Sequence, residues 1–343
     1  MLKNKNLRRL NLHGFTPKII ILIGIIVLIS SFVGCGTNNK KEIEYDIVVA
    51  QDGSGDFINI RDAIDSIPSG NNERVLIYIK NGYYNSYAIV EEGQNKISLI
   101  GESRENTIIS TNNPASLGSA QGSATLKVKG DDFTAENITF ENAYGRGSQA
   151  LAAYVEGDRA VFKNCGFLGY QDTLNVESRS EDKISRSYFE DCYIEGDVDF
   201  IYGTGRAVFY KCEIKSLVRD NKKGGYITAA DTLKSNEYGL VFIDCKLTSD
   251  NKNESVDYLG RAYGPDGNVI FKNCYMGAHI KKEGWTDMKY NAANARFYEY
   301  KNTGPGAAVN DTRRQLSDSE ADKITIENIL SGSDNWDPRE PVY

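Results

Sequence analysis

Histidine is almost missing from this chain of 343 residues, which contains only His13 and His279. His13 lies in the N-terminal leader described below, so a Ser-His-Asp triad would have to be built on His279, and no Gly-x-Ser-x-Gly turn is present. Histidine and cysteine at metal-ligand spacing are also missing, as is a glycine-rich phosphate loop. We therefore interpret His279 as a structural or surface residue and predict neither a metal nor a cofactor. Carboxylate chemistry is the class that remains.

An excess of positive charge is missing too. The sequence has 40 Lys and Arg against 47 Asp and Glu, a formal net charge of −7. This acidic balance argues against a nucleic-acid partner and provides no long-range attraction for an anionic polymer. Helix-length periodic stretches are almost absent, and glycine, asparagine and aspartate separate many short candidate strands. The chain is therefore expected to be all-β.

The first 34 residues have the pattern of an export signal. Residues 1–18 carry five Lys or Arg and no acid, an apolar run follows over 19–29, and Gly34 directly precedes Cys35. The apolar run is shorter than the roughly 20 residues that a membrane span needs. The pattern therefore predicts a signal peptide over 1–34.

The Gly34-Cys35 junction resembles the lipobox of bacterial lipoproteins, in which the cysteine is lipidated and becomes the first mature residue. A polar stretch follows, which predicts a tether over 35–44. We expect lipidation of Cys35 to hold the protein on a membrane surface outside the cytoplasm, with the folded domain over 45–343. The alternative is an ordinary signal peptide with an incidental cysteine.

Five segments of the body repeat one pattern: an aromatic residue, two further residues, a cysteine, one further residue and an apolar residue. They occupy 162–167, 189–194, 209–214, 242–247 and 271–276. Units of about 20 to 33 residues favour the rungs of a parallel β-helix, which stack around one continuous core. We interpret the cysteines as small buried residues of an inward-facing ladder, although neighbouring rungs would also allow a disulfide.

The two ends of such a solenoid need covering. Residues 47–50 predict a first strand, and 60–67 predict a short helix, ended by Pro68, that caps one open end. The segment after Ser317 is expected to cover the other end.

Asp172 and Asp199 occupy the same position in two consecutive units, seven residues after Cys165 and Cys192 respectively. Equal offsets place the two carboxylates on adjacent rungs, where neighbouring strands lie about 4.8 Å apart. Both carboxylates cannot ionise freely at that separation, so one pKa should rise. One aspartate is therefore suited to act as a nucleophile or base and the other as an acid.

Five motifs around these residues resemble, in order, those of the pectin methylesterase (pectinesterase) family of carbohydrate esterases, over nearly all of the chain after the leader. They are 82–86 with Ser86 in place of Glu, 148–152, 169–174, 196–203 with Tyr202 in place of Phe, and 259–264 with Ala262 and Tyr263 in place of Pro-Trp. The resemblance implies a right-handed, single-stranded parallel β-helix, a pectin-lyase-like solenoid. It also implies that the substrate is methyl-esterified pectin (homogalacturonan), which the enzyme converts to galacturonate and methanol.

The resemblance also assigns roles to residues of this sequence. Asp199 would be the nucleophile, and Gln149 and Gln171 would stabilise the oxyanion. Asp172 would be the general acid and then the base, and Arg261 would orient Asp199. The scheme needs no metal. The alternatives are that the aspartates are turn residues, that the glutamines form a structural amide ladder, and that Arg261 pairs with a surface acid.

Four aromatic residues are candidates for stacking against sugar rings: Tyr170, Tyr202, Tyr263 and Trp285. An aromatic residue in a solenoid is equally consistent with a place in the core. Tyr263 stands where the resembled family has a tryptophan of the substrate groove, so specificity could differ there while catalysis is retained.

Three other functions remain open from the sequence. The same scaffold could hydrolyse another ester or a thioester, as in an acyl-CoA thioesterase. It could be a pectin-acting lyase or a polygalacturonase, although the Gly-His-Gly block of the latter is absent. It could also be a non-catalytic carbohydrate-binding solenoid, which would not need this set of carboxylate, amide and arginine side chains. We expect a monomer.

Overall fold

The computed structural model describes residues 43–219, 224–250 and 255–341. The predicted signal over 1–34, Cys35 and nearly all of the predicted tether therefore lie outside the described residues. Within the described part of the chain, no helix is long and apolar enough to cross a membrane.

Almost all of the regular structure is β-strand, in three parallel sheets whose strands repeat in turn along the chain. The first sheet has ten strands: β1 (Ile47–Val49), β2 (Val75–Ile79), β5 (Ile97–Gly101), β8 (Thr134–Glu136), β11 (Ala160–Lys163), β14 (Arg186–Glu190), β17 (Arg206–Tyr210), β20 (Leu240–Ile243), β23 (Asn268–Lys272) and β26 (Arg296–Tyr300). The second sheet has eight: β4 (Ala88–Val90), β7 (Leu126–Val128), β10 (Ala153–Val155), β13 (Leu174–Val176), β16 (Val198–Gly203), β19 (Tyr226–Ala230), β22 (Tyr258–Ala262) and β25 (Trp285–Asp287). The third sheet also has eight: β3 (Gly82–Asn85), β6 (Thr107–Thr111), β9 (Thr139–Asn142), β12 (Gly166–Leu168), β15 (Tyr193–Gly196), β18 (Glu213–Ser216), β21 (Lys246–Ser249) and β24 (Tyr275–Met276).

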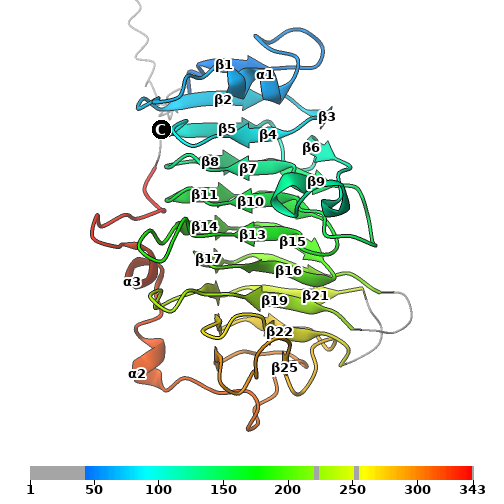
Figure 1. The fold of residues 1–343 in the computed structure, drawn as a ribbon, viewed down its shortest axis with the longest axis vertical. Coiled ribbons are helices and arrows are strands. Elements are labelled where there is room, and N and C mark those ends of the chain that lie inside the picture. Colours follow the sequence, from blue (N-terminus) through cyan, green and yellow to red (C-terminus); the bar gives the residue numbers. More distant parts are fainter. Residues whose placement is uncertain (1–42, 220–223, 251–254, 342–343) are drawn as a thin grey trace, which may run out of the picture. The chain divides into compact units, whose positions relative to one another are not determined.

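Eight successive rungs of the stack each contribute one strand to every sheet, and β1 and β26 add one further strand to each end of the first sheet (Figure 1). The fold is a right-handed parallel β-helix, and the all-β prediction is confirmed. Such a stack leaves sheet edges open only at its two ends, because every inner strand is paired on both sides.

The repeated aromatic and cysteine positions form the core of this stack. Phe162, Phe189, Phe209, Phe242 and Phe271 lie on successive strands of the first sheet and stack with ring centroids 4.8, 4.7, 4.6 and 4.4 Å apart. The five repeat cysteines are all buried and none forms a disulfide. The interpretation of the cysteines as small inward-facing core residues is therefore confirmed.

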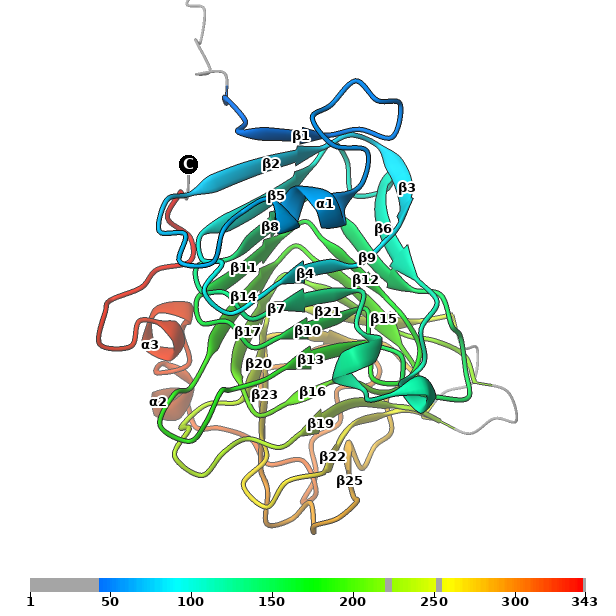
Figure 2. The same cartoon turned by 45° about the horizontal axis from the view of Figure 1, so that its top comes forward.

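The predicted capping helix is present as α1 (Ile60–Asp65). Asn59 caps its N-terminus by accepting a hydrogen bond from the Asp62 amide. Its apolar face, Ile60, Ala63 and Ile64, is buried in the same core as the sheets, and Figure 2 shows α1 between the first sheet and β4. The helix ends two residues earlier than predicted, because the residue before Pro68 disfavours helical backbone.

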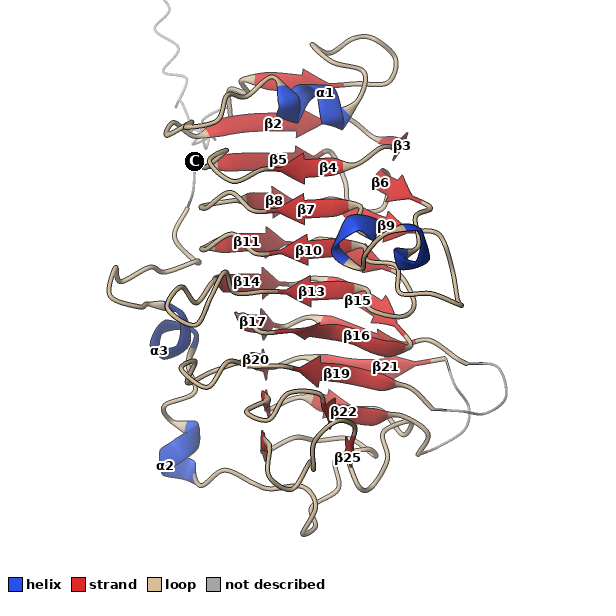
Figure 3. Cartoon of the chain, in the orientation of Figure 1, coloured by secondary structure: helices blue, strands red, loops and turns tan. Residues whose placement is uncertain are grey.

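The expectation for the C-terminal segment is wrong. The helices α2 (Asp318–Ala321) and α3 (Ile326–Leu330) do not cover the open end; they lie against the outer face of the first sheet (Figure 3). That face is apolar along several strands, with Val161, Tyr188 and Val208 buried beneath Ile329 and Leu330. Burying this stripe is the physical reason for the helices' position.

The chain just before these helices closes the end instead. Arg313 is 1% exposed and its Nε donates to Glu299 Oε1 at 2.6 Å. The same guanidinium donates to the Gly306 carbonyl at 2.7 Å and reaches Met276 Sδ at 3.1 Å. Arg313 thus ties this loop to the last strand of the first sheet through its ion pair with Glu299, and to the last strand of the third sheet through Met276.

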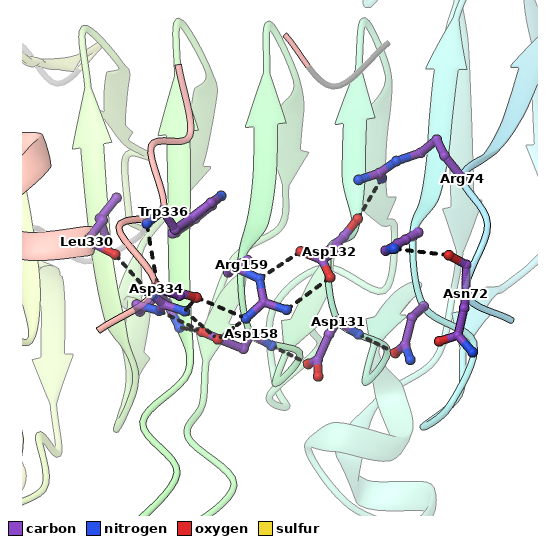
Figure 4. Close-up of polar contacts among 12 residues, drawn as sticks. Asn72, Arg74, Asp131, Asp132, Asp158, Arg159, Leu330, Asp334 and Trp336 are labelled. Atoms are coloured by element: carbon purple, nitrogen blue, oxygen red, sulfur yellow. Dashed lines mark hydrogen bonds and ion pairs between the residues drawn. The ribbon is translucent and has the colours of Figure 1, made fainter. Parts of the chain in front are cut away.

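Beyond α3, the chain is fastened to the side of the stack by ion pairs (Figure 4). Arg186 Nη1 contacts Asp334 at 2.6 Å and its Nη2 contacts Asp158 at 2.7 Å. Arg159 pairs with the adjacent Asp158 and with Asp132 on the preceding rung. These contacts lie where the strands of the first sheet begin, and none of their residues lines the cleft described next.

Two short 3-10 turns complete the regular structure. They are Ala115–Leu117 and Gln121–Ser123, in the connection between β6 and β7. This connection matters because it forms one wall of the cleft over the second sheet.

Candidate active site

Asp172 and Asp199 lie side by side on adjacent rungs. Gln171 forms a parallel β-bridge with Val198, and Leu174 pairs with Ile201. The two pairs have the same register and enclose the aspartates, so Asp172 lies opposite Asp199. Both aspartates have left-handed backbone, with φ of 64° and 50°. That conformation is uncommon outside glycine but accessible to aspartate, and it turns each carboxylate out of the regular strand alternation.

The two carboxylates open into a cleft of about 420 Å³ on the outer face of the second sheet. Its lining combines strand residues with the 3-10 turn at 121–123. The polar lining residues are Gln121, Gln149, Gln171, Asp172, Asn175, Glu177, Asp199, Tyr202, Thr204, Asp231, Arg261 and Tyr263. A concave site with convergent polar groups is suited to a small-molecule or polymer substrate.

Asp199 is held by an arginine. Arg261 Nε donates to Asp199 Oδ1 at 2.8 Å, and Arg261 Nη2 donates to Asp199 Oδ2. The guanidinium lies 4.0 Å from the ring centre of Tyr226, which supports it from the neighbouring strand. Burial raises the pKa of Asp199 above its usual value, while the hydrogen bonds and charge of Arg261 act in the opposite direction.

Asp172 has only neutral partners. Gln149 Nε2 donates to Asp172 Oδ2 at 2.7 Å, and the side chains of Gln171 and Tyr202 also hydrogen-bond to this carboxyl group. Burial, followed by the charge of Asp199, raises the pKa of Asp172 to about 7. The two neighbouring carboxylates are therefore in different electrostatic environments.

This difference has a chemical consequence. Near neutral pH the pair can hold one proton, with Asp172 the protonated member and Asp199 the ionised member paired with Arg261. A nucleophile or base then stands next to an acid. Among the described residues, no group of three or more His, Cys, Asp or Glu side chains is arranged to hold a metal ion.

The structure brings most of the sequence-predicted site residues together. Both aspartates, both glutamines and Arg261 line the cleft, as do Tyr202 and Tyr263. Tyr170 lies beside it, with Arg146 Cζ 4.7 Å from its ring centre.

Trp285 and His279 are placed elsewhere. Trp285 is 6% exposed and stacks on Phe297 with ring centroids 4.4 Å apart, so it belongs to the core rather than to the cleft lining. His279 is 3% exposed, and burial lowers its pKa to about 4. It is thus a buried structural residue.

Sequence reasoning missed several residues of the cleft. Tyr226 supports Arg261, and Asn175, Glu177 and Asp231 line the cleft floor. Alternation along β13 offers a signal for two of them, because Asn175 and Glu177 flank the buried Val176. Tyr226 carries no comparable signal, since its role depends on the pairing of β19 with β22, whose residues are far apart in the sequence.

Comparisons with known proteins agree with this geometry. The family profile described as Pectinesterase matches residues 46–333. Pectinesterase 31 of Arabidopsis thaliana is 41% identical over 292 residues, which cover 80% of this chain and 88% of that protein.

Solved structures of pectin methylesterases are also similar to this chain. Pectin methylesterase PemA from Erwinia chrysanthemi is 33% identical with a TM-score of 0.80, over 88% of this chain and 100% of that one. A pectin methylesterase in complex with hexasaccharide VII is also 33% identical, with a TM-score of 0.78 over the same shares of the two chains.

Proposed function

This chain belongs to the pectinesterase family, and from that membership we propose how its cleft residues divide the reaction. The protein is a carboxylic ester hydrolase that cleaves the methyl esters of pectin to galacturonate carboxylates and methanol. Asp199 is the nucleophile and Asp172 is the general acid and base. Gln149, Gln171 and Arg261 position and stabilise the reacting groups.

The first half of the reaction forms an acyl-enzyme. A carboxylate oxygen of Asp199 attacks the C6 carbonyl carbon of a methyl-esterified galacturonate, and the carbonyl oxygen becomes an oxyanion. The Gln149 and Gln171 amides, which hydrogen-bond to Asp172 in the free enzyme, donate to that oxyanion. The C–O bond to the methoxy group breaks as Asp172 gives its proton to the departing methanol.

The second half restores the enzyme. Asp172, now ionised, takes a proton from a water molecule, and the water oxygen attacks the C6 carbonyl of the acyl-enzyme. The bond to Asp199 breaks and Asp172 keeps the proton it took from water for the next turnover. The product leaves with the second proton of the water as galacturonic acid, which ionises to the carboxylate by releasing that proton to solvent. Arg261 holds the Asp199 carboxylate in a fixed orientation during both steps.

The observation that carries this assignment is the different pairing of two stacked carboxylates. Asp199 is paired with a guanidinium, and Asp172 is buried among neutral donors with its pKa raised to about 7. An ionised nucleophile beside a neutral acid is what ester cleavage at neutral pH requires. No part of the scheme uses a metal or another cofactor, and one chain supplies every group.

The direct test measures methanol and thiol release in parallel. We expect methanol from highly methylated pectin and no free thiol from a long-chain acyl-CoA, because the cleft is polar along its floor and offers an acyl chain little apolar surface. Fully de-esterified polygalacturonate is the control and should give no methanol. Thiol release without methanol release would overturn the assignment in favour of a thioesterase.

Members of the pectinesterase family are extracellular enzymes, and this chain shares that location. We further propose that residues 1–34 are a lipoprotein signal, that lipidated Cys35 anchors the enzyme to a membrane, and that 35–44 form the tether. The basic start, short apolar run and Gly34-Cys35 junction support this.

Replacement of the anchor cysteine tests the last proposal. In a bacterial host fed labelled palmitate, the wild-type protein should be labelled and found in the membrane fraction, and the Cys35→Ser variant should be neither. Cys274→Ser, which changes a buried core cysteine, is the matched control and should keep the label. Equal labelling of wild type and Cys35→Ser would refute lipidation at this site.

A further inference from the structure

The loop that carries Gln149 has little regular structure of its own. It connects β9 to β10 over residues 143–152, which contain no helix or strand. Gly145 and Gly147, just before Gln149, have left-handed backbone with φ of 86° and 112°. Glycine restricts the backbone less than any other residue. Contacts from outside the loop must therefore hold the Gln149 amide against Asp172, which it reaches at 2.7 Å.

Backbone hydrogen bonds hold one end of this loop. The Gln149 carbonyl accepts from the Ala115 amide at 2.8 Å, and the Ala150 amide donates to the Gln171 carbonyl at 3.2 Å. These bonds place the main chain at 149–150, but they do not hold the glycine-rich residues that precede it.

The side chain of Arg146 holds that preceding part. Its Nε donates to Asp197 Oδ2 at 2.7 Å, and its Nη2 donates to the Val218 carbonyl at 2.6 Å. Its Cζ lies 4.7 Å from the ring centre of Tyr170. Tyr170, Asp197 and Val218 lie between the third and second sheets on three successive rungs. One guanidinium therefore fastens the loop to each of the next three rungs.

Asp197 is a rigid anchor for this guanidinium. Its amide donates to the Tyr170 carbonyl at 3.0 Å, and its carbonyl accepts from the Tyr226 amide at 3.1 Å. The residue is 3% exposed. Its other cationic neighbour, Arg219, has Nε 3.9 Å from Oδ2, which is too long for a hydrogen bond. The carboxylate thus depends on Arg146 for its charge-assisted contact, and a buried carboxylate is costly to leave without one.

We propose that Arg146 is a positioning residue for ester hydrolysis, and that its ion pair with Asp197 holds the loop so that the Gln149 amide is aimed at the oxyanion. This deepens the proposed function and rests on it. Arg146 and Asp197 are not among the described residues that line the cleft, so they act on the reaction through Gln149. An oxyanion donor stabilises the transition state only while its geometry is held closely.

The titration of Asp172 reports on the position of Gln149. Burial and the charge of Asp199 raise the pKa of Asp172 to about 7, and the hydrogen bond from Gln149 acts in the opposite direction. The other charged or titratable groups that face Asp172 within the described chain are Tyr202 and Arg261. When the loop is loosened and these groups stay in place, the hydrogen bond weakens and the pKa rises.

Replacing Arg146 with alanine should lower kcat for methanol release from highly methylated pectin by about tenfold, a part of what removal of an oxyanion donor costs. KM should stay within about twofold, because no cleft-lining side chain is removed. The alkaline limb of kcat/KM should move up by about half a pH unit to one unit. Arg146→Lys keeps the cation but not the planar fork, so its loss should be smaller.

Two double-variant comparisons show whether Arg146 acts through the proposed route. In a Gln149→Ala background, Arg146→Ala should change kcat by less than about twofold, because the group that it positions is gone. Asp197→Asn should reproduce the effect of Arg146→Ala, and the two changes together should cost no more than either alone.

Arg61→Ala is the matched control. Arg61 on α1 forms a comparable ion pair, 2.6 Å from Asp65, and its side chain is 38% exposed like that of Arg146. Its loss should leave kcat and the pH profile unchanged.

Melting temperatures establish that each variant is folded. If Arg146→Ala does not fold, Arg146→Lys serves for the same comparison in the Gln149→Ala background. A rise in KM at unchanged kcat would overturn the proposal, because Arg146 would then contact the polymer directly. An equal fall in kcat with and without Gln149 would also overturn it. Absence of methanol with the wild type would instead refute the proposed function itself.

Discussion

Replacing Asp199 with asparagine is expected to lower kcat for methanol release from highly methylated pectin by about 10⁴-fold or more. An amide nitrogen or oxygen is a poor nucleophile, and the acyl-enzyme cannot form without the carboxylate. The side chain keeps its size, so the cleft should keep its shape. Arg261 would lose both charge-assisted contacts to Asp199, which removes the group that it orients.

Asp191→Asn is the matched control for this experiment. Asp191 is exposed and has the same left-handed backbone, with φ of 53°, on the preceding turn of the same rung. The same chemical change at that position should leave methanol release within about twofold of the wild type. If Asp199→Asn retained more than a few per cent of wild-type activity while folded, Asp199 would not be the nucleophile.

Replacing Asp172 with asparagine is expected to lower the activity of the enzyme and to raise its stability. Methanol release should fall by about 10² to 10⁴-fold, the usual contribution of a general acid. In the wild type, activity should fall as the pH rises through about 7, because Asp172 ionises there and can no longer donate its proton. That alkaline limb belongs to the coupled pair and should be read from kcat/KM against pH.

The effect on stability has the opposite sign. The folded-state pKa of Asp172 is raised from 3.8 to about 7, so the folded protein keeps a proton that the unfolded chain releases. Folding is therefore penalised as the pH rises from 3.8 to about 7, and the penalty is complete above that range. At pH 8 it amounts to at most about 4 kcal/mol. Asp172→Asn removes this penalty.

Urea unfolding at pH 8 and pH 5 measures this prediction. Asp172→Asn should be more stable than the wild type, and the gain should be larger at pH 8. Asp199→Asn is the contrasting variant, since it deprives a half-buried guanidinium of its partner and should destabilise the protein at both values. A gain for Asp172→Asn that does not change with pH would show that the raised pKa is not its cause.

Much of this protein could be predicted from local patterns. The spacing of aromatic and cysteine residues predicted the rungs, and the stacked rings and buried cysteines follow it. The equal offsets of Asp172 and Asp199 predicted their contact, because the 27 residues that separate Cys165 from Cys192 also separate the paired positions of β13 and β16. A periodic sequence determines a periodic structure when each unit can bury its apolar face only against the next.

Other features depended on contacts between distant residues. The position of α3 was predicted wrongly because the apolar stripe on the outer face of the first sheet is spread over five rungs and is visible only once they are stacked. The sequence left Trp285 open between sugar stacking and a place in the core, and the closing rung turns it onto Phe297 in the core.

The residues of the cleft likewise divide into those that local patterns predicted and those that only distant contacts bring together. The sequence by itself determined the fold class, the family and the two aspartates that face each other, because these follow from repeats and short motifs. Only the tertiary structure decided between Asp199 and a surface acid as the partner of Arg261, 62 residues further along the chain, and placed Glu177 and Asp231 in the same cleft. Rung lengths change along the stack, and β16 is bulged where it meets β19, so side-chain neighbours across strands cannot be counted from residue numbers. They are set by strand register, which only the packing of the whole core determines.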